Sequence, residues 1–407
     1  MPDPTDTPQT FGQRVRRLRE RRGMTRPVLG GLVGRSAEWV KAIECGRLGV
    51  PRLPVLLRLA DVLAAQDLAD LTGEERLTAS SYSKAAHDAL PAVAAALTRY
   101  QLGTPDEEPG SASVLLDRVA DAWRLWHAAG AHRTRVAALL PDLLADVQHA
   151  ARAATGTERR QLLAAQTEVY HLAQLFLSFQ PVPELVMLTG DRAMTAAQDA
   201  DSPRAIASAA WYMNHVFRDA GEQHEARVDL AMRAADLLDP ERDADSRARW
   251  GLLHLAAALS YAKVGRRGDA ERYWDHADDA ARSLRDYVHP YLMFGQAMVD
   301  AYAITMRADL VQGRDAVEAA ERVDVSAVPS ATRRAFHSVE TARAYSLQRE
   351  PVAVVHMLQR AWTESPETVR YNLFARGAVA EVTANGPATV RRDAEVLRHR
   401  MGVPVTA

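Results

Sequence analysis

Residues 11–47 hold three short stretches with the apolar period of a helix, and each stretch ends at a glycine. In the first, Phe11, Val15 and Leu18 recur at the spacing that places side chains on one helical face, and Gly23 ends it. Basic side chains fill the other faces of this helix: Arg14, Arg16, Arg17, Arg19, Arg21 and Arg22. Because such short helices are stabilised mainly by packing against others, the pattern predicts a small helical bundle.

The second and third stretches carry residues that start and stop helices. Thr25 is a good N-cap, Pro27 is tolerated in the first turn that follows, and Gly34 ends this short helix. Ser36 is a good N-cap for the third helix, which Gly46 ends. The inward positions of these two helices are Leu29, Leu32, Val33, Val40 and Ile43. Two short helices joined by a tight glycine turn have the geometry of a helix-turn-helix.

A fourth apolar helix follows Pro54, and residues 67–71 favour one further turn. The inward positions of the fourth helix are Leu56, Leu57, Ala60 and Leu63. The sequence therefore predicts an all-α, five-helix domain over residues 11–72. The polar stretch over residues 1–10 is expected to be disordered.

The residues of this domain resemble the lambda-repressor/Cro-type (Xre) helix-turn-helix family. The matching positions are Phe11 to Thr25, Leu29, Gly34, Ser36 and Ile43 to Arg47. In that family Ser36 to Glu44 would be the recognition helix, which enters the major groove of double-stranded DNA. The resemblance implies DNA contacts for Arg26, Arg35, Ser36, Ala37, Glu38, Trp39, Lys41, Ala42 and Arg47.

These residues depart from the family in ways that affect how DNA would be recognised. Arg26 stands where the family usually has Gln and is expected to contact phosphate. Ala37, Glu38 and Ala42 replace amide or hydroxyl side chains; an alanine can contact only a thymine methyl, and a glutamate accepts from cytosine N4. The domain is therefore expected to attract phosphate strongly and to read bases through few contacts.

The distribution of charge also favours a polyanionic partner for this domain. Residues 11–58 hold twelve Arg or Lys and three acids, a balance of +9, whereas the whole chain of 407 residues carries −2. A basic head on an acidic body is typical of a chain whose head binds nucleic acid. We use "head" for residues 11–72 and "body" for residues 113–407.

Composition narrows the class of protein further. Hydrophobic residues make up 47% and charged residues 25%, as in an ordinary globular protein. Cys45 is the only cysteine, so an intramolecular disulfide is excluded. No apolar stretch approaches the roughly 18 residues needed to span a bilayer, and no signal-peptide pattern is present, so a cytoplasmic location without membrane contact is expected. Residues 73–112 are expected to form a linker, with a short helix over 91–100 and an acidic loop over 102–113.

The body is predicted to be an α-solenoid of tetratricopeptide (TPR) type. Gly265, Ala270, Trp274 and Ala277 have the spacing of a TPR unit, with Tyr261 four residues before the glycine. A weaker copy has Phe217, Gly221, Ala226 and Pro240, and another has Tyr345, Arg349, Val354, Leu358, Ala361 and Pro366, with Arg349 in place of the glycine. Further helices are expected around 114–128, 136–153, 159–178 and 184–199.

Stacked helix pairs of this kind form a concave surface to which the first helix of each pair contributes. On one such helix, residues that suit a peptide or small-molecule effector cluster: Trp211, Tyr212, Asn214, His215 and Arg218. We found no phosphate loop, nucleophile elbow or metal-ligand spacing, so no catalytic residue, metal or cofactor is predicted, and the chain is not expected to be an enzyme.

The sequence thus favours a transcription regulator that binds double-stranded DNA through its head, responds to an effector in its body and forms a homodimer on a roughly palindromic operator. Two alternatives stay open: a protein-interaction scaffold with a vestigial head, and an enzyme with an unrecognised site. Salt-sensitive DNA binding distinguishes the first alternative from a regulator, and a cofactor bound to the purified protein would favour the second.

Overall fold

The computed structural model describes residues 9–73, 84–100, 110–128, 130–220 and 224–404, and over 216–220 it describes the backbone alone. Every regular element within these ranges is helical, as the sequence predicts. None of the helices described there is long and apolar enough to cross a lipid bilayer.

The head consists of five short helices: α1 (Phe11–Arg21), α2 (Arg26–Leu32), α3 (Ala37–Glu44), α4 (Leu53–Leu63) and α5 (Ala69–Thr72). The predicted caps are confirmed, since the Thr25 hydroxyl accepts from the Val28 amide and the Ser36 hydroxyl accepts from the Trp39 amide. The predicted stops are confirmed as well: the glycines after the first three helices all have a left-handed backbone, which glycine adopts without steric cost. They are Gly23, Gly34 and Gly46.

The apolar core of the head matches most of the predicted inward positions. Its buried members are Val15, Leu18, Leu29, Val33, Val40, Ile43, Leu56, Leu59, Leu63 and Leu71. Two predictions are wrong: Leu32 and Leu57 are half exposed, at 52% and 50%. In α4 the buried face consists of Leu56, Leu59 and Leu63, so the helix is rotated relative to the prediction. Because nearly every residue of this stretch is apolar, its sequence does not indicate which face is buried.

The body is a succession of antiparallel helices. The first part comprises α7 (Leu90–Thr98), α8 (Ala112–Ala128), α9 (His132–Ala153), α10 (Gly156–Leu177), α11 (Pro183–Asp199), α12 (Pro203–Ala220), α13 (His224–Ala235) and α14 (Ala244–Lys263). The second part comprises α15 (Arg267–Leu284), α16 (Gln296–Asp309), α17 (Gly313–Arg322), η1 (Val325–Ala327), α18 (Ala331–Leu347), α19 (Pro351–Glu364), α20 (Pro366–Tyr371), α21 (Leu373–Asn385) and α22 (Ala388–Arg400). The four helices expected between residues 114 and 199 are confirmed as α8 to α11.

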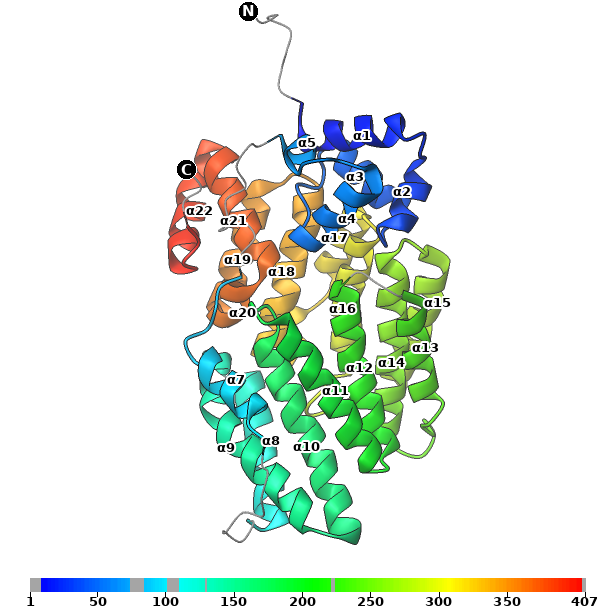
Figure 1. Cartoon of the computed structure of the whole chain (residues 1–407), viewed down its shortest axis with the longest axis vertical. Helices are drawn as coiled ribbons and strands as arrows, with labels where there is room; N and C mark the ends of the chain where they lie inside the picture. The colour runs from blue at the N-terminus through cyan, green and yellow to red at the C-terminus, as the bar shows by residue number, and fades with distance from the viewer. Residues whose placement is uncertain (1–8, 74–83, 101–109, 129, 221–223, 405–407) are drawn as a thin grey trace, which may run out of the picture.

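Consecutive helices of the body pack as in a solenoid (Figure 1). Each even-numbered helix from α10 to α18 packs against the even-numbered helix before it, and α18 returns to contact α8. The odd-numbered helices α9, α11, α13, α15 and α17 each pack against the two even-numbered helices on either side in the chain. The even-numbered helices therefore form an inner layer and the odd-numbered helices an outer one.

The strongest repeat signature has the packing role that its spacing predicts. Ala270 and Ala277 are fully buried on the face of α15 that packs against α14, and Gly265 has φ +79° in the turn between these helices. Of the weaker copy, Gly221 and the side chain of Phe217 lie outside the described residues, and Ala226 is exposed, so it does not serve close packing. In the last copy Val354, Leu358 and Ala361 are buried on α19.

Part of the expected linker belongs to the body. The short helix predicted over 91–100 is confirmed as α7, and its buried Leu90, Val93 and Leu97 join the same apolar cluster as α8 to α16. Two stretches of the expected linker, 74–83 and 101–109, lie outside the described residues, and so do residues 1–8. The second stretch includes most of the expected acidic loop. The chain from 90 to 98 is therefore packed rather than free.

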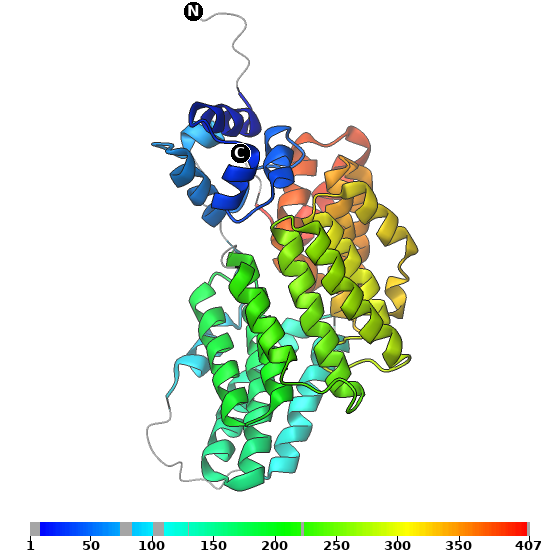
Figure 2. The same cartoon turned by 90° about the vertical axis from the view of Figure 1, so that its right-hand side faces the viewer.

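The head lies at one end of the body, beside the turns that follow α14, α16 and α18 (Figures 1 and 2). Leu48, in the loop between α3 and α4, belongs to the apolar core of the head and also packs against a second cluster. The buried members of that cluster are Ile304, Ala308, Ala316, Ala344 and Leu347. Head and body are thus joined by side-chain packing.

Candidate DNA-binding interface

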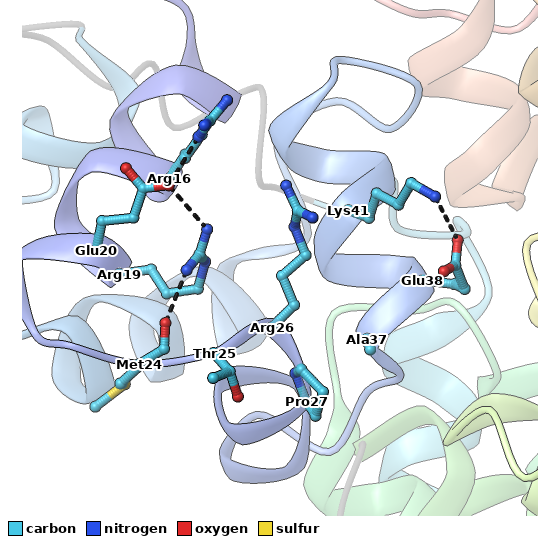
Figure 3. A pocket seen from close by; sticks show the side chains of 10 residues that line it. All are labelled: Arg16, Arg19, Glu20, Met24, Thr25, Arg26, Pro27, Ala37, Glu38 and Lys41. Carbon is cyan, nitrogen blue, oxygen red and sulfur yellow. Dashed lines mark hydrogen bonds and ion pairs between the residues drawn. The ribbon is translucent and has the colours of Figure 1, made fainter.

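A basic hollow of about 560 Å³ opens on the head where α1 ends and α2 and α3 begin (Figure 3). Four basic and two acidic side chains line it, together with small and apolar ones. Its lining residues are Arg16, Arg19, Glu20, Met24, Thr25, Arg26, Pro27, Ala37, Glu38 and Lys41. Open access and an excess of positive charge are what a phosphate backbone requires of its binding site.

Under the hollow, an ion triad ties the first three helices together. The Glu44 carboxylate, whose side chain is 2% exposed, accepts from Arg19 Nε at 2.5 Å and from Arg26 Nε at 2.8 Å. Arg19 also donates to the Met24 carbonyl at 2.7 Å, in the turn between α1 and α2. The triad fixes the angle of α3 against α1 and α2, and therefore the geometry of the helix-turn-helix.

The triad modifies two expectations. Arg19, which the sequence pattern assigns to an exposed face, is buried. Arg26 lies at the start of α2 as expected and remains 39% exposed, but its Nε is already bonded to Glu44. Arg26 is among the side chains that line the hollow.

The outer face of α3 presents most, but not all, of the predicted residues. Glu38 and Lys41 are 59% and 52% exposed and form an ion pair of 3.7 Å, while Ala37 is half-buried. Trp39 is half-buried and packs against the core of the head, with the Arg35 guanidinium 5.9 Å from its ring centroid. The expectation that Ala42 is exposed is wrong, because its side chain is fully buried.

The two ends of α3 hold the remaining predicted residues. Ser36 is buried at the N-terminal end. Arg47 Nε, beyond the C-terminal end, donates to the Cys45 sulfur at 3.3 Å. Burial raises the pKa of the Cys45 thiol, but the hydrogen bond and charge of Arg47 outweigh it, so this pKa lies below its ordinary value.

The predicted effector residues on α12 are mainly part of the core. Trp211, Tyr212 and Asn214 are at most 3% exposed, so the expectation that they line an open concave surface is wrong. The ring of the half-buried His215 lies 4.3 Å from that of Trp211, and the side chain of Arg218 lies outside the described residues. The inner position of α12 between α10 and α14 covers these side chains.

Asn214 has a structural role that its residue type did not reveal. Its Nδ2 donates to the Arg227 carbonyl at 2.8 Å, and its Oδ1 accepts from the Ser260 hydroxyl at 2.9 Å, so it joins α12 to α13 and α14.

Asn214→Ala is therefore expected to lower the free energy of unfolding of the body by about 2 kcal/mol, because it leaves buried polar groups without partners. Chemical denaturation followed by circular dichroism measures the change. The control is Asn385→Ala, which removes an exposed hydrogen bond to Glu381 and is expected to have almost no effect. A loss for Asn214→Ala no larger than that of the control would contradict this role.

Two buried histidines that the sequence did not single out lie on the inner helices: His171 beside Tyr212, and His337 beside Tyr302, whose ring also neighbours Trp211. The ring of His171 on α10 lies 4.3 Å from that of Tyr212, at an angle of 32°, and its Nδ1 lies 3.4 Å from the Glu168 carboxylate. Burial lowers the pKa of His337 on α18 to about 3, so its imidazole is neutral. Several atoms of this inner region have no hydrogen-bond partner within the described ranges: His171 Nε2, Trp211 Nε1, Tyr212 Oη, His337 Nδ1 and His337 Nε2.

Comparison with known proteins supports the assignment of the head. Residues 10–72 match a family model described as a helix-turn-helix domain. No curated protein and no solved structure matches the chain. The match and the geometry agree on the same residues, so the head is a helix-turn-helix domain.

Proposed function

We propose that the chain is a transcription regulator that binds double-stranded DNA in a sequence-specific manner. The observation that carries the proposal is the basic hollow at the start of α2 and α3 of a helix-turn-helix domain. Arg16, Arg26 and Lys41 would bind phosphates of the DNA backbone, and Glu38 and Ala37 would face the base edges.

The proposal is tested by selection of duplexes from a random pool with the full chain. Enrichment of one sequence motif is the expected result. A palindromic motif, together with a dimer in analytical ultracentrifugation at micromolar concentration, would agree with the homodimer that the Xre-type resemblance implies. Recovery of an unselected pool at every salt concentration would favour the alternative, an interaction scaffold with a vestigial head.

Glu38→Ala is expected to change the preferred sequence rather than the overall affinity. Glu38 is exposed on the outer face of α3, where its carboxylate can accept from cytosine N4, and a bidentate or well-placed base contact contributes about 1–3 kcal/mol of discrimination. The same selection with the variant measures the change. If the variant enriches the motif of the unmodified chain, Glu38 does not read bases.

The response to an effector is the second part of the proposal. Its support is a set of buried polar atoms on the inner helices α10, α12 and α18 that have no hydrogen-bond partner in the described part of the chain. Tyr212 lies beside His171, and Trp211 and His337 both neighbour Tyr302. The neutral imidazole of His337, the phenol of Tyr212 and the indole of Trp211 suit a molecule with hydrogen-bonding groups, such as a small peptide segment or a metabolite. An effector that shifts operator affinity 5- to 150-fold requires a coupling free energy of only about 1–3 kcal/mol.

A titration tests this part. Candidate peptides and metabolites are added to the complex of the chain with its selected duplex, and Tyr212→Phe, which removes the hydroxyl alone, is compared with the unmodified chain. An effector whose influence on DNA affinity is the same in both proteins binds elsewhere.

A further inference from the structure

Three turns of the body lie next to the head and share an unusual backbone. The turns after α14, α16 and α18 each contain a residue with a left-handed conformation, Gly265 at φ +79°, Val311 at φ +60° and Arg349 at φ +61°. Glycine adopts this conformation freely, whereas arginine and a β-branched valine rarely do. Two of the three turns therefore retain a side chain where glycine would be less strained.

Two of these turns contact the two ends of α3. A Cβ atom built on Gly265 would lie 2.2 Å from the Cβ of Ser36, the N-cap of α3, so the turn and the helix end are in direct contact. At the other end, Arg349 Nη2 donates to the Cys45 carbonyl at 2.9 Å. Cys45 is the C-cap of α3.

The third turn belongs to the apolar contact between head and body. Val311 packs against the cluster of α16, α17 and α18 to which Leu48 of the head also contributes. Leu48 comes directly after Arg47, in the loop that follows α3. The body therefore contacts α3 at its start, at its end and in the loop beyond it.

We propose that this docked arrangement is an autoinhibited state of the DNA-binding head, an inference that rests on the proposed function. A recognition helix of eight residues is about 12 Å long, comparable with the width of the major groove. Its N-terminal residues contact the base edges, while the first helix of the pair crosses the phosphate backbone. With Gly265 against Ser36 and Arg349 against Cys45, the body occupies space that a duplex around α3 requires, although the hollow beside α2 stays open.

The side chains at the two strained positions contribute to the docking. Strained residues persist where surrounding structure holds them, and they gather at switches and binding sites. Arg349 supplies the guanidinium that reaches the head, and Val311 supplies apolar surface to the shared cluster. Replacing Arg349 by glycine removes the hydrogen bond to Cys45, and replacing Val311 by glycine removes apolar surface from the shared cluster. Glycine also suits the left-handed backbone of both turns.

The test is the DNA affinity of the full chain carrying Arg349→Gly together with Val311→Gly. Release of the head raises the fraction of molecules able to bind, so the affinity for the selected duplex is expected to rise about tenfold. Hydrogen exchange of the amides over residues 36–48, measured without DNA, is expected to accelerate. The matched control is Asp201→Gly, another non-glycine residue with a left-handed backbone, in the turn between α11 and α12. It is expected to leave both quantities unchanged.

The outcomes separate this inference from the proposed function. Equal DNA affinity of the unmodified chain, the double variant and the control overturns the autoinhibited state and leaves the proposed function standing. Faster hydrogen exchange in the double variant without any gain in DNA affinity also overturns it, because the head would then be released from the body without binding DNA better. Absence of DNA binding by all three proteins, with faster exchange in the double variant, overturns the proposed function and the autoinhibition with it.

Discussion

Glu44→Ala is expected to lower the free energy of unfolding of the head by about 3–5 kcal/mol. The carboxylate is 2% exposed and bonds both Arg19 and Arg26, so its removal leaves the buried guanidinium of Arg19 with only the half-exposed Glu20 carboxylate, at 3.4 Å. Breaking a buried ion pair on one side costs more than the pair contributes, because the remaining charge stays out of water. Such a loss is comparable with the whole stability of a small domain.

Hydrogen exchange resolves this effect, since it reports the head and the body separately within one chain. The expected result is rapid exchange over residues 11–72 with unchanged protection of the body. Glu20→Ala is the matched control: the Glu20 carboxylate is 52% exposed, pairs with Arg16 at 2.9 Å and reaches Arg19 only at 3.4 Å, so its removal is expected to leave protection nearly unchanged. If the amides of the head are as protected from exchange in the Glu44→Ala variant as in the Glu20→Ala variant, the triad does not hold the three helices together.

Replacing Arg16, Arg26 and Lys41 together by alanine is expected to weaken DNA binding by at least about 100-fold. These side chains line the hollow and are 59%, 39% and 52% exposed, so they are accessible to phosphate. Each hydrogen bond to a charged group contributes about 1.5–3 kcal/mol, and three such contacts account for the loss even if they are not additive. Arg19 stays paired with Glu44, so the fold of the head is expected to survive.

Three exposed arginines of the body provide the control for this variant. Arg282, Arg314 and Arg322 are 68%, 86% and 78% exposed and each pairs with an acid on its own helix. Their joint replacement by alanine removes the same charge from the chain. Fluorescence anisotropy with one labelled duplex measures the DNA affinity of both variants. An equal loss of affinity in the two would show that the net charge of the chain, rather than the hollow, determines DNA binding.

Local signals explain why the helices of the head were predictable. Caps such as Thr25 and Ser36, and glycine stops such as Gly34, act within a few residues, and the structure confirms them. The sequence determines less well which face of an apolar helix is buried. Because α4 has apolar side chains on nearly every face, Leu57 was expected in the core, whereas the structure buries Leu59. The choice depends on the packing of α4 against α1 and on the apolar core that α4 shares with Leu71 of α5.

Interactions between distant residues explain what the sequence did not reveal. Arg19 and Glu44 are 25 residues apart, and nothing in an arginine-rich helix distinguishes the one arginine that is buried. The effector residues on α12 were misplaced because the neighbouring inner helices cover Trp211 and Asn214. The contact of Arg349 with Cys45 spans 304 positions, a distance at which no local pattern operates.

The central claim is that the head binds duplex DNA through its hollow, and the salt dependence of binding by the full chain tests it most directly. Each phosphate that the protein neutralises contributes about −0.9 to the slope of log affinity against log salt concentration. We expect a linear decrease for the unmodified chain, and a slope shallower by about 2–3 for the variant that lacks Arg16, Arg26 and Lys41. Binding that is independent of salt, or an identical slope in the two proteins, would contradict the account.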